Sequence, residues 1–233
     1  EAAGSIKQDF VTARQLKLNA IVMRPTELFA KVDYDRSLIP GVIVMALFMG
    51  SLTSGVFNFV MDKFMGVTEC YLVTPLARWQ IALGMLGSGV LVTSTAATIV
   101  LFLGLIVTRG TIAGGLPALL TLIGLIVVAG TGLLAMMFVL LGRAGHPRLV
   151  GVMSGFLNVI LFFPSGAIYP VESFPRWLRR FALINPETHA VSALKSILFK
   201  GADFRAISGD ATFLAVFMVI MLVLASVSFK RTL

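Results

Sequence analysis

Five uncharged stretches constrain the fold of this chain more than any other feature of its sequence. Residues 37–61, 79–108, 110–142, 149–171 and 211–229 contain no Asp, Glu, Lys or Arg. About 20 apolar residues cross the ~30 Å hydrocarbon core of a bilayer, and backbone groups in lipid are satisfied only in helices or closed barrels. The stretches are too continuous for the alternating pattern of a barrel strand. The sequence therefore predicts an all-α fold, a polytopic membrane helix bundle with five spans.

Composition supports this fold and excludes several other classes. The 233 residues are 58% hydrophobic and 13% charged, with a mean hydropathy of +0.95, which excludes an ordinary soluble domain. The net charge is +8, but the basic residues flank the predicted spans and so indicate membrane anchoring rather than nucleic-acid binding. The single cysteine, Cys70, excludes an internal disulfide and a Cys-based metal cluster, and His146 and His189 have no metal-ligand spacing.

The predicted spans lie near residues 39–60, 83–107, 116–141, 149–163 and 211–229, within a single transmembrane domain over residues 1–233. Ahead of them, Lys17, Arg24 and Lys31 recur every seven residues, which puts them on one face of a helix, and apolar residues fall on another face. We therefore predict an amphipathic surface helix over residues 10–30. A solvated, partly disordered leader is the alternative.

The chemistry that the spans lack narrows the function. No span contains an ionisable residue, which argues against a secondary transporter that energises itself. The chain has no P-loop and no hydrolase or metalloprotease motif, so we expect no enzyme activity, no catalytic residue and no metal site. Neutral polar residues, among them Asn58, Thr95 and Asn158, either line a path for an amphipathic substrate or form hydrogen bonds between helices. A passive channel, a structural membrane subunit and a permease driven by a partner remain.

Residues 61–78 predict a short amphipathic helix between the first two spans. Phe64, Val67, Thr68 and Tyr71 lie at helical spacing, and the Thr74-Pro75 pair stops the helix. Such a helix can dock in a groove of a partner protein, or it forms a re-entry turn that rests on the membrane surface.

Residues 163–200 predict two amphipathic helices around proline-containing corners. The breaker Phe163-Pro164-Ser165-Gly166 ends the fourth span, Ser173 is expected to cap the first helix, and Asn185-Pro186 separates it from the second. Phe174, Trp177, Leu178 and Phe181 form the apolar stripe of the first helix, and Val191, Leu194 and Leu198 that of the second. We therefore predict a partly inserted hairpin with Trp177 at the level of the lipid headgroups.

The same residues resemble a known family. Phe-Pro-Ser-Gly-Ala-Ile-Tyr-Pro-Val-Glu-Ser-Phe-Pro-Arg-Trp-Leu (163–178) and Ile-Asn-Pro-Glu-Thr-His-Ala-Val-Ser-Ala-Leu-Lys (184–195) look like the C-terminal signature of ABC-2 type transporter permeases. Leu-Ile-Pro-Gly (38–41) resembles the opening of that family's second span, and residues 66–69 and 72–76 resemble its cytoplasmic coupling helix.

The resemblance implies the transmembrane subunit of an ATP-driven exporter, multi-pass in the cell inner (plasma) membrane. It implies a dimer, expected to be a homodimer, with ABC ATPase subunits that bind ATP and Mg, whereas this chain binds no cofactor. It also implies that residues 61–78 contact the ATPase and that residues 164–199 form re-entrant helices on the outer side. The expected coupling residues are Phe64, Gly66, Thr68, Glu69, Thr74 and Pro75, and the expected re-entrant or gate residues are Pro164, Ser165, Gly166, Pro170, Pro175, Trp177, Asn185 and Pro186.

The uncharged spans predict an amphipathic, lipid-like or drug-like substrate carried in contact with membrane lipid. A lipid-linked polysaccharide is an alternative substrate, and a nucleotide-independent channel or a structural subunit is an alternative function.

The number of spans differs from that of the family. The resemblance implies six spans where five are found, so we suspect a missing span near Ala30–Lys31. Read as one continuous chain, the side that bears residues 170–210 carries 13 Lys and Arg against 6 on the other side, which would place it in the cytoplasm. Restoring a span gives 10 inside and 9 outside, which allows the family's topology, with residues 61–78 inside.

Overall fold

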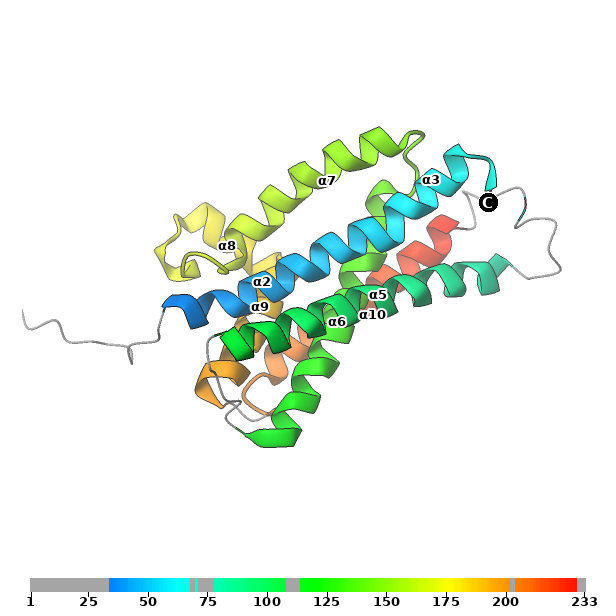
Figure 1. Ribbon diagram of the computed structural model, residues 1–233. Helices are drawn as coiled ribbons and strands as arrows, with labels where there is room; N and C mark the ends of the chain where they lie inside the picture. The colour runs from blue at the N-terminus through cyan, green and yellow to red at the C-terminus, as the bar shows by residue number, and fades with distance from the viewer. Residues whose placement is uncertain (1–33, 68–69, 71–77, 108–113, 202–203, 230–233) are drawn as a thin grey trace, which may run out of the picture. The chain divides into compact units, whose positions relative to one another are not determined.

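The computed structural model describes residues 34–67, 70, 78–107, 114–201 and 204–229, and the regular structure in them is helical (Figure 1). The helices are α2 (Tyr34–Gly50), the π-helix η1 (Ser51–Phe57), α3 (Asn58–Phe64), α5 (Arg78–Val107), α6 (Gly115–Leu141), α7 (Pro147–Phe162), the 3-10 turns η2 (Phe163–Ser165) and η3 (Val171–Ser173), α8 (Arg176–Ile184), α9 (Pro186–Lys200) and α10 (Ser208–Phe229).

Five of these helical stretches are long and apolar enough to span a membrane. They are Leu38–Phe64, Leu83–Val107, Gly115–Leu141, Pro147–Ser165 and Ser208–Ser228. The prediction of a polytopic helical bundle is confirmed, with five candidate spans among the described residues. The amphipathic helix predicted over residues 10–30 and the span suspected to be missing near Ala30–Lys31 lie outside the described residues.

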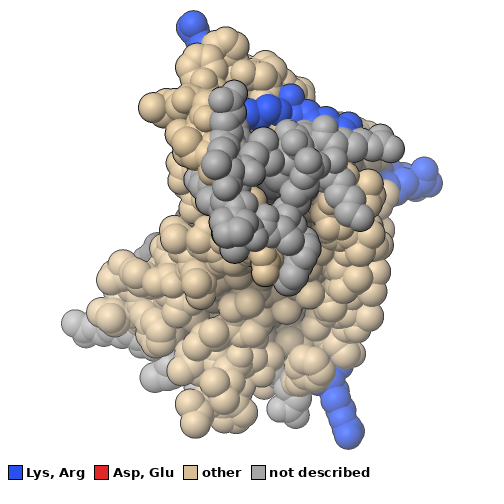
Figure 2. Space-filling view, turned by 90° about the vertical axis from the view of Figure 1, so that its right-hand side faces the viewer, with Lys and Arg blue, Asp and Glu red and all other residues tan. Residues whose placement is uncertain are grey.

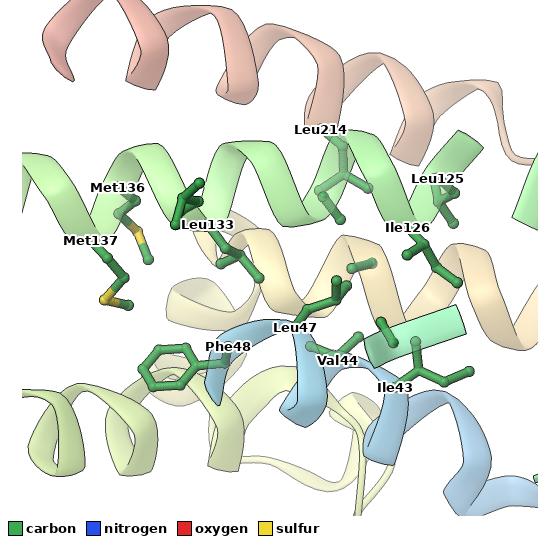
Figure 3. Packing of buried hydrophobic residues seen from close by; sticks show 14 of the residues in the cluster. Ile43, Val44, Leu47, Phe48, Leu125, Ile126, Leu133, Met136, Met137 and Leu214 are labelled. Atoms are coloured by element: carbon green, nitrogen blue, oxygen red, sulfur yellow. The ribbon is translucent and has the colours of Figure 1, made fainter. Parts of the chain in front are cut away.

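Helix α6 is the centre of the bundle. It packs against α10, α5, η1, α9 and α2. About two thirds of the residues in its most apolar stretch are buried. Its side chains and those of α2 point toward one another in Figure 3, where Ile126 and Leu133 lie opposite Leu47 and Phe48. Because α6 is apolar on all sides, it can occupy a position with protein neighbours around it.

Small residues let the first three described spans approach closely. Ideal Cβ atoms on Gly55 and on Gly89 would both clash with the Leu134 side chain of α6, so two helices use their glycines to accommodate one leucine. The Ser54 and Thr93 hydroxyls lie 3.3 Å apart across the same contact. Close packing through small residues is a common way to associate helices in lipid, where no hydrophobic effect drives association.

Helix α7 runs beside the α2–η1–α3 helix and is largely exposed within the chain (Figure 1). The two short helices after it differ sharply. Helix α8 buries only Ala182, whereas α9 is mostly buried against α2, α6 and α10. The second helix of the predicted hairpin is therefore a core element of the bundle, whereas the first leaves Trp177 and Phe181 of its apolar stripe exposed.

Candidate functional site

The fourth span ends in a break that leaves backbone carbonyls without helical partners. Helix α7 gives way at Phe163 to the 3-10 turn η2, and Gly166 follows with φ 79°. Pro164 has no N–H to donate, so the preceding turn lacks one hydrogen bond. A Cβ on Gly166 would also lie 2.9 Å from the Val171 side chain, so glycine satisfies both the backbone angle and the available space.

Three side chains from residues 185–195 donate to these carbonyls. Asn185 Nδ2 donates to the Leu161 carbonyl at 2.6 Å, Thr188 Oγ1 to the Pro164 carbonyl at 3.5 Å, and Lys195 Nζ to the Gly166 carbonyl at 2.6 Å. We call Asn185, Thr188 and Lys195, together with the three carbonyls, the clasp. Because buried carbonyls need partners, the clasp explains why a broken helix is stable inside the bundle.

Asn185 joins two elements with one side chain. Its Oδ1 accepts from the Glu187 N–H at 3.1 Å and so caps α9, while its Nδ2 binds the end of α7. The residue is 2% exposed, and Pro186 after it starts the helix, where a missing N–H costs nothing. Of the residues predicted to form the gate, Pro164, Ser165, Gly166, Asn185 and Pro186 lie together at this break.

The other predicted gate residues lie on the outer turn. Pro170 precedes η3, Pro175 is the N-cap position of α8, and Trp177 is 71% exposed. The expected cap at Ser173 is wrong, because its hydroxyl donates to the Pro170 carbonyl at 2.7 Å and α8 begins only at Arg176. The placement of Trp177 at the headgroups stays a prediction.

The start of the first described span closes the site from another side. An ideal Cβ on Gly41 would lie 2.8 Å from the Ala167 Cβ, and Ile39 and Pro40 are buried. The Leu-Ile-Pro-Gly segment therefore packs directly against the turn after the helix break. The site unites three segments that are far apart in the sequence.

Several titratable side chains lie on α9 or act on it close to the clasp. Burial lowers the pKa of Lys195, and the negative charge of Glu172 opposes that shift. The pKa of His189 is raised because its Nδ1 donates a hydrogen bond to the Asp210 carboxylate at 2.7 Å, and its Nε2 lies 2.9 Å from the Leu183 carbonyl. These bonds tie α9 to the start of α10 and the end of α8.

Glu187 differs from these groups because none of the described residues is its partner. The residue is 0% exposed, and neither carboxylate oxygen has a hydrogen-bond partner in the part of the chain that the structure describes. Burial raises the pKa of Glu187 to about 8. The N-terminus of α9 would stabilise an anion by at most about 2 kcal/mol, whereas desolvation costs several kcal/mol, so the neutral acid is favoured near neutral pH.

Sequence reasoning missed the most constrained residues of this site. Thr188, Lys195 and Glu187 were not among the predicted site residues, because a helix that starts Asn-Pro-Glu-Thr is typical of an exposed first turn. Their burial depends on contacts with α7 and η2, at a separation of 24 residues for Asn185 and Thr188. The available signal was that Glu187 and Thr188 lie inside the segment that resembles the family signature.

The opposite end of α7 contacts the segment predicted to couple to a partner. Phe64, the last residue of α3, packs on His146 just before α7, with ring centroids 4.7 Å apart. Gly66 ends this helix with φ 76°. Figure 2, which views this end of the bundle, shows Lys and Arg side chains and no visible Asp or Glu.

Four of the six predicted coupling residues lie outside the described part of the chain: Thr68, Glu69, Thr74 and Pro75. Phe64 belongs to the helix of the first described span, so the predicted coupling segment begins as an extension of that span.

The three residues predicted to line a substrate path differ in exposure. Asn58 and Thr95 are exposed, and Asn158 is half-buried with its Nδ2 atom unpartnered. A hollow of about 440 Å³ lies instead beside His146, Arg148, Leu149 and Val152. The path stays a prediction.

Comparisons with known proteins agree with the architecture. A family model described as ABC-2 type transporter matches residues 10–199. The "Probable multidrug ABC transporter permease YbhR" of Escherichia coli (strain K12) is 30% identical over 175 residues, which are 74% of this chain and 46% of that protein. The "Putative transport permease ycf38" of Porphyra purpurea is 28% identical over 180 residues, which are 74% of this chain and 59% of that protein. The chain thus spans about half the length of the curated relatives it matches.

Proposed function

The chain belongs to the ABC-2 type transporter family, and from this premise we propose that it is the permease subunit of an ABC exporter. In this proposal the chain forms the membrane path, and a separate ABC ATPase subunit binds ATP and Mg and hydrolyses the nucleotide. Export proceeds through a shift between inward- and outward-facing states that ATPase closure drives. The complex is placed in the cell inner (plasma) membrane.

The proposed substrate is amphipathic, lipid-like or drug-like. The five spans offer apolar surface and neutral hydroxyl groups, and most of these hydroxyls donate to a carbonyl one turn earlier in their own helix, as Ser51 does to Leu47. Such a surface presents few free hydrogen-bonding groups and suits a molecule with a large apolar part. The printed name of the Escherichia coli relative, a multidrug permease, agrees with this substrate class.

A second copy of the chain is the proposed partner within the membrane. Helix α7 exposes Val152, Phe156 and Val159, and Gly151 and Gly155 beside them have open space where a side chain would stand. A helix with small residues one turn apart allows close approach of another helix. We propose that α7 packs in part against the second copy and in part against membrane lipid.

One observation carries the proposed coupling: α7 is held at both ends by the two segments that transport requires to move together. Phe64 packs on His146 at its start, and Asn185 binds the Leu161 carbonyl at its end. Sixteen residues of helix span about 24 Å. A displacement of residues 61–78 by the ATPase would therefore reach the clasp through a rigid helix.

Purification of the protein from its native membrane, with ATPase activity measured on the product, tests this proposal. We expect a stoichiometric nucleotide-binding subunit. Phe64→Ala should leave assembly intact and lower substrate-stimulated ATP turnover on the order of two- to tenfold, because a ring contact contributes about 0.5–1.5 kcal/mol. Glu69→Ala should act in the same direction.

The matched control is Ile106→Ala, since Ile106 is 71% exposed near the C-terminal end of α5, lies outside residues 61–78 and should not alter turnover. A pure chain without an ATPase partner would favour a channel or a structural subunit. Unchanged turnover in Phe64→Ala, with unchanged transport, would remove the α7 route from the mechanism.

A further inference from the structure

Glu187 is a fully buried acid inside a tightly bonded corner. Its side chain is 0% exposed, and among the described residues neither of its oxygens has a hydrogen-bond partner. A carboxylate in such a place has lost its hydration without any interaction in exchange, which is among the most costly states for a protein side chain. The group therefore needs either a proton or a cation.

The polar neighbours of Glu187 on its own turn are committed elsewhere. Asn185 binds the Leu161 carbonyl and the Glu187 N–H, Thr188 binds the Pro164 carbonyl, and His189 binds Asp210. Each of these bonds also fixes α9 to another element. With the clasp closed, both carboxyl oxygens of Glu187 are left without a hydrogen-bond partner among the described residues.

The described side chains of the elements packed against α9 do not supply a compensating cation. Helix α6, turn η2 and residues 38–50 of α2 contain no ionisable residue. The described arginines nearby, Arg176, Arg179 and Arg180 on α8 and Arg148 at the far end of α7, are all exposed. Asp210 on α10 is bonded to His189, and Lys195 on α9 is bonded to the Gly166 carbonyl. The burial of Glu187 is consequently not offset by an opposite charge among the described side chains.

We propose that Glu187 is a proton-binding site that keeps the corner between α7 and α9 closed. The carboxyl group holds a proton taken from water on one of its two oxygens while the clasp is formed, and it releases that proton to water when the corner opens. No covalent bond other than this O–H bond forms or breaks. By linkage, conditions that favour the ionised form also favour opening. The inference goes beyond the transport function proposed above and does not depend on an ATPase.

The first test is the pH dependence of thermal unfolding of the full protein in detergent. Between about pH 5 and pH 6 an unfolded glutamate has lost most of its proton. The contribution of the histidines is common to the wild type and Glu187→Gln, so the comparison of the two removes it. The native protein then binds one more proton than the unfolded chain through Glu187, so stability falls as pH rises. We expect the midpoint of the wild type to fall by about 3–5 °C per pH unit relative to Glu187→Gln.

Glu172→Gln is the matched control, because Glu172 is an exposed glutamate near the same corner. It should keep the wild-type slope. Equal slopes in the wild type and in Glu187→Gln would overturn the proposal, as would a slope that depends on sodium concentration at fixed pH, since that would indicate a bound cation.

Accessibility of the corner is the second test. Ala190 lies one turn beyond Glu187 and is 1% exposed. In a Cys70→Ser background, Ala190→Cys should react faster with a water-soluble maleimide at pH 9 than at pH 6. The ratio of the two labelling rates should be larger when Glu187 is present than in the Glu187→Gln variant. In the Glu187→Gln variant the ratio reflects the ionisation of the thiol, which raises its reactivity at high pH. The excess of the ratio in the presence of Glu187 therefore reports opening of the corner. Equal ratios would contradict the coupling of the proton to closure.

Infrared spectroscopy covers the case in which Glu187→Gln does not fold. The wild-type protein should show the carbonyl band of a buried protonated carboxylic acid at neutral pH, lost at high pH and shifted in Glu187→Asp. The absence of that band at neutral pH would overturn the proposal.

Discussion

At the scale of single residues, the site is governed by hydrogen bonds that replace those lost at a helix break. Asn185 is the clearest case, because it satisfies the end of one helix and caps the start of another while only 2% exposed. Removing a side chain that serves a buried carbonyl leaves that carbonyl without water or protein to bind it. The energetic effect therefore exceeds that of an ordinary surface hydrogen bond.

Asn185→Ala should destabilise the protein by about 2–4 kcal/mol, the combined effect of a lost helix cap and an orphaned buried carbonyl. Reversible unfolding in mixed micelles measures this change. Ser173→Ala removes a similar local bond at an exposed position, so its effect should stay within about 0.5 kcal/mol. If both variants lost the same amount of stability, the clasp would have no special role.

At the scale of elements, close approach between helices decides the arrangement. The first described span contains the π-helix η1, whose wider turn places Gly55 against Leu134 and Ser54 against Thr93. Segments of π-helix in α-helices are frequent at functional sites. The same span begins with Gly41, packed on Ala167 beside the helix break. One helix thus contacts both the central helix α6 and the clasp.

Gly41→Ala should destabilise the protein by about 1–3 kcal/mol, because its new methyl group would meet the Ala167 Cβ at 2.8 Å and neither neighbour has a flexible side chain to move. Gly87→Ala is the matched change in another span, where open space surrounds the new methyl group. It should be neutral or stabilising by up to about 1 kcal/mol. Thermal midpoints of the two variants give the comparison, and equal destabilisation would contradict the close contact at Gly41.

At the scale of the whole molecule, the two ends of the bundle have different character. One end carries the helix break, α8 and the clasp, and the other carries Phe64 and His146, with Lys63, Arg143 and Arg148 close to them in the chain. The proposed coupling requires the second end to face the cytoplasm, where an ATPase and ATP are available. A test of orientation is therefore a test of the transport model.

Cys70 reports this orientation because it is the single cysteine and is exposed as a free thiol. An impermeant maleimide should leave Cys70 unlabelled in intact cells and should label it after permeabilisation. As a control, Ser173→Cys in a Cys70→Ser background should react in intact cells, since Ser173 is exposed at the other end. Ready labelling of Cys70 from outside would invert the topology and remove the ATPase contact from residues 61–78.

The sequence alone determined the five spans, their helical nature and the break at residues 163–166, because hydropathy, chain length and proline chemistry act locally. Span bounds such as Leu83–Val107 were predicted as the structure has them. The family resemblance was also readable, since it lies in short segments such as residues 184–195.

Only the tertiary structure decided that α9 is a core helix and that Asn185, Thr188 and Lys195 bind the carbonyls of the break. It also decided that Glu187 is buried without a partner among the described residues. The physical reason is that each of these properties depends on atoms from segments more than twenty residues away. An amphipathic pattern gives the apolar face of a helix, but burial of its polar face depends on what packs there.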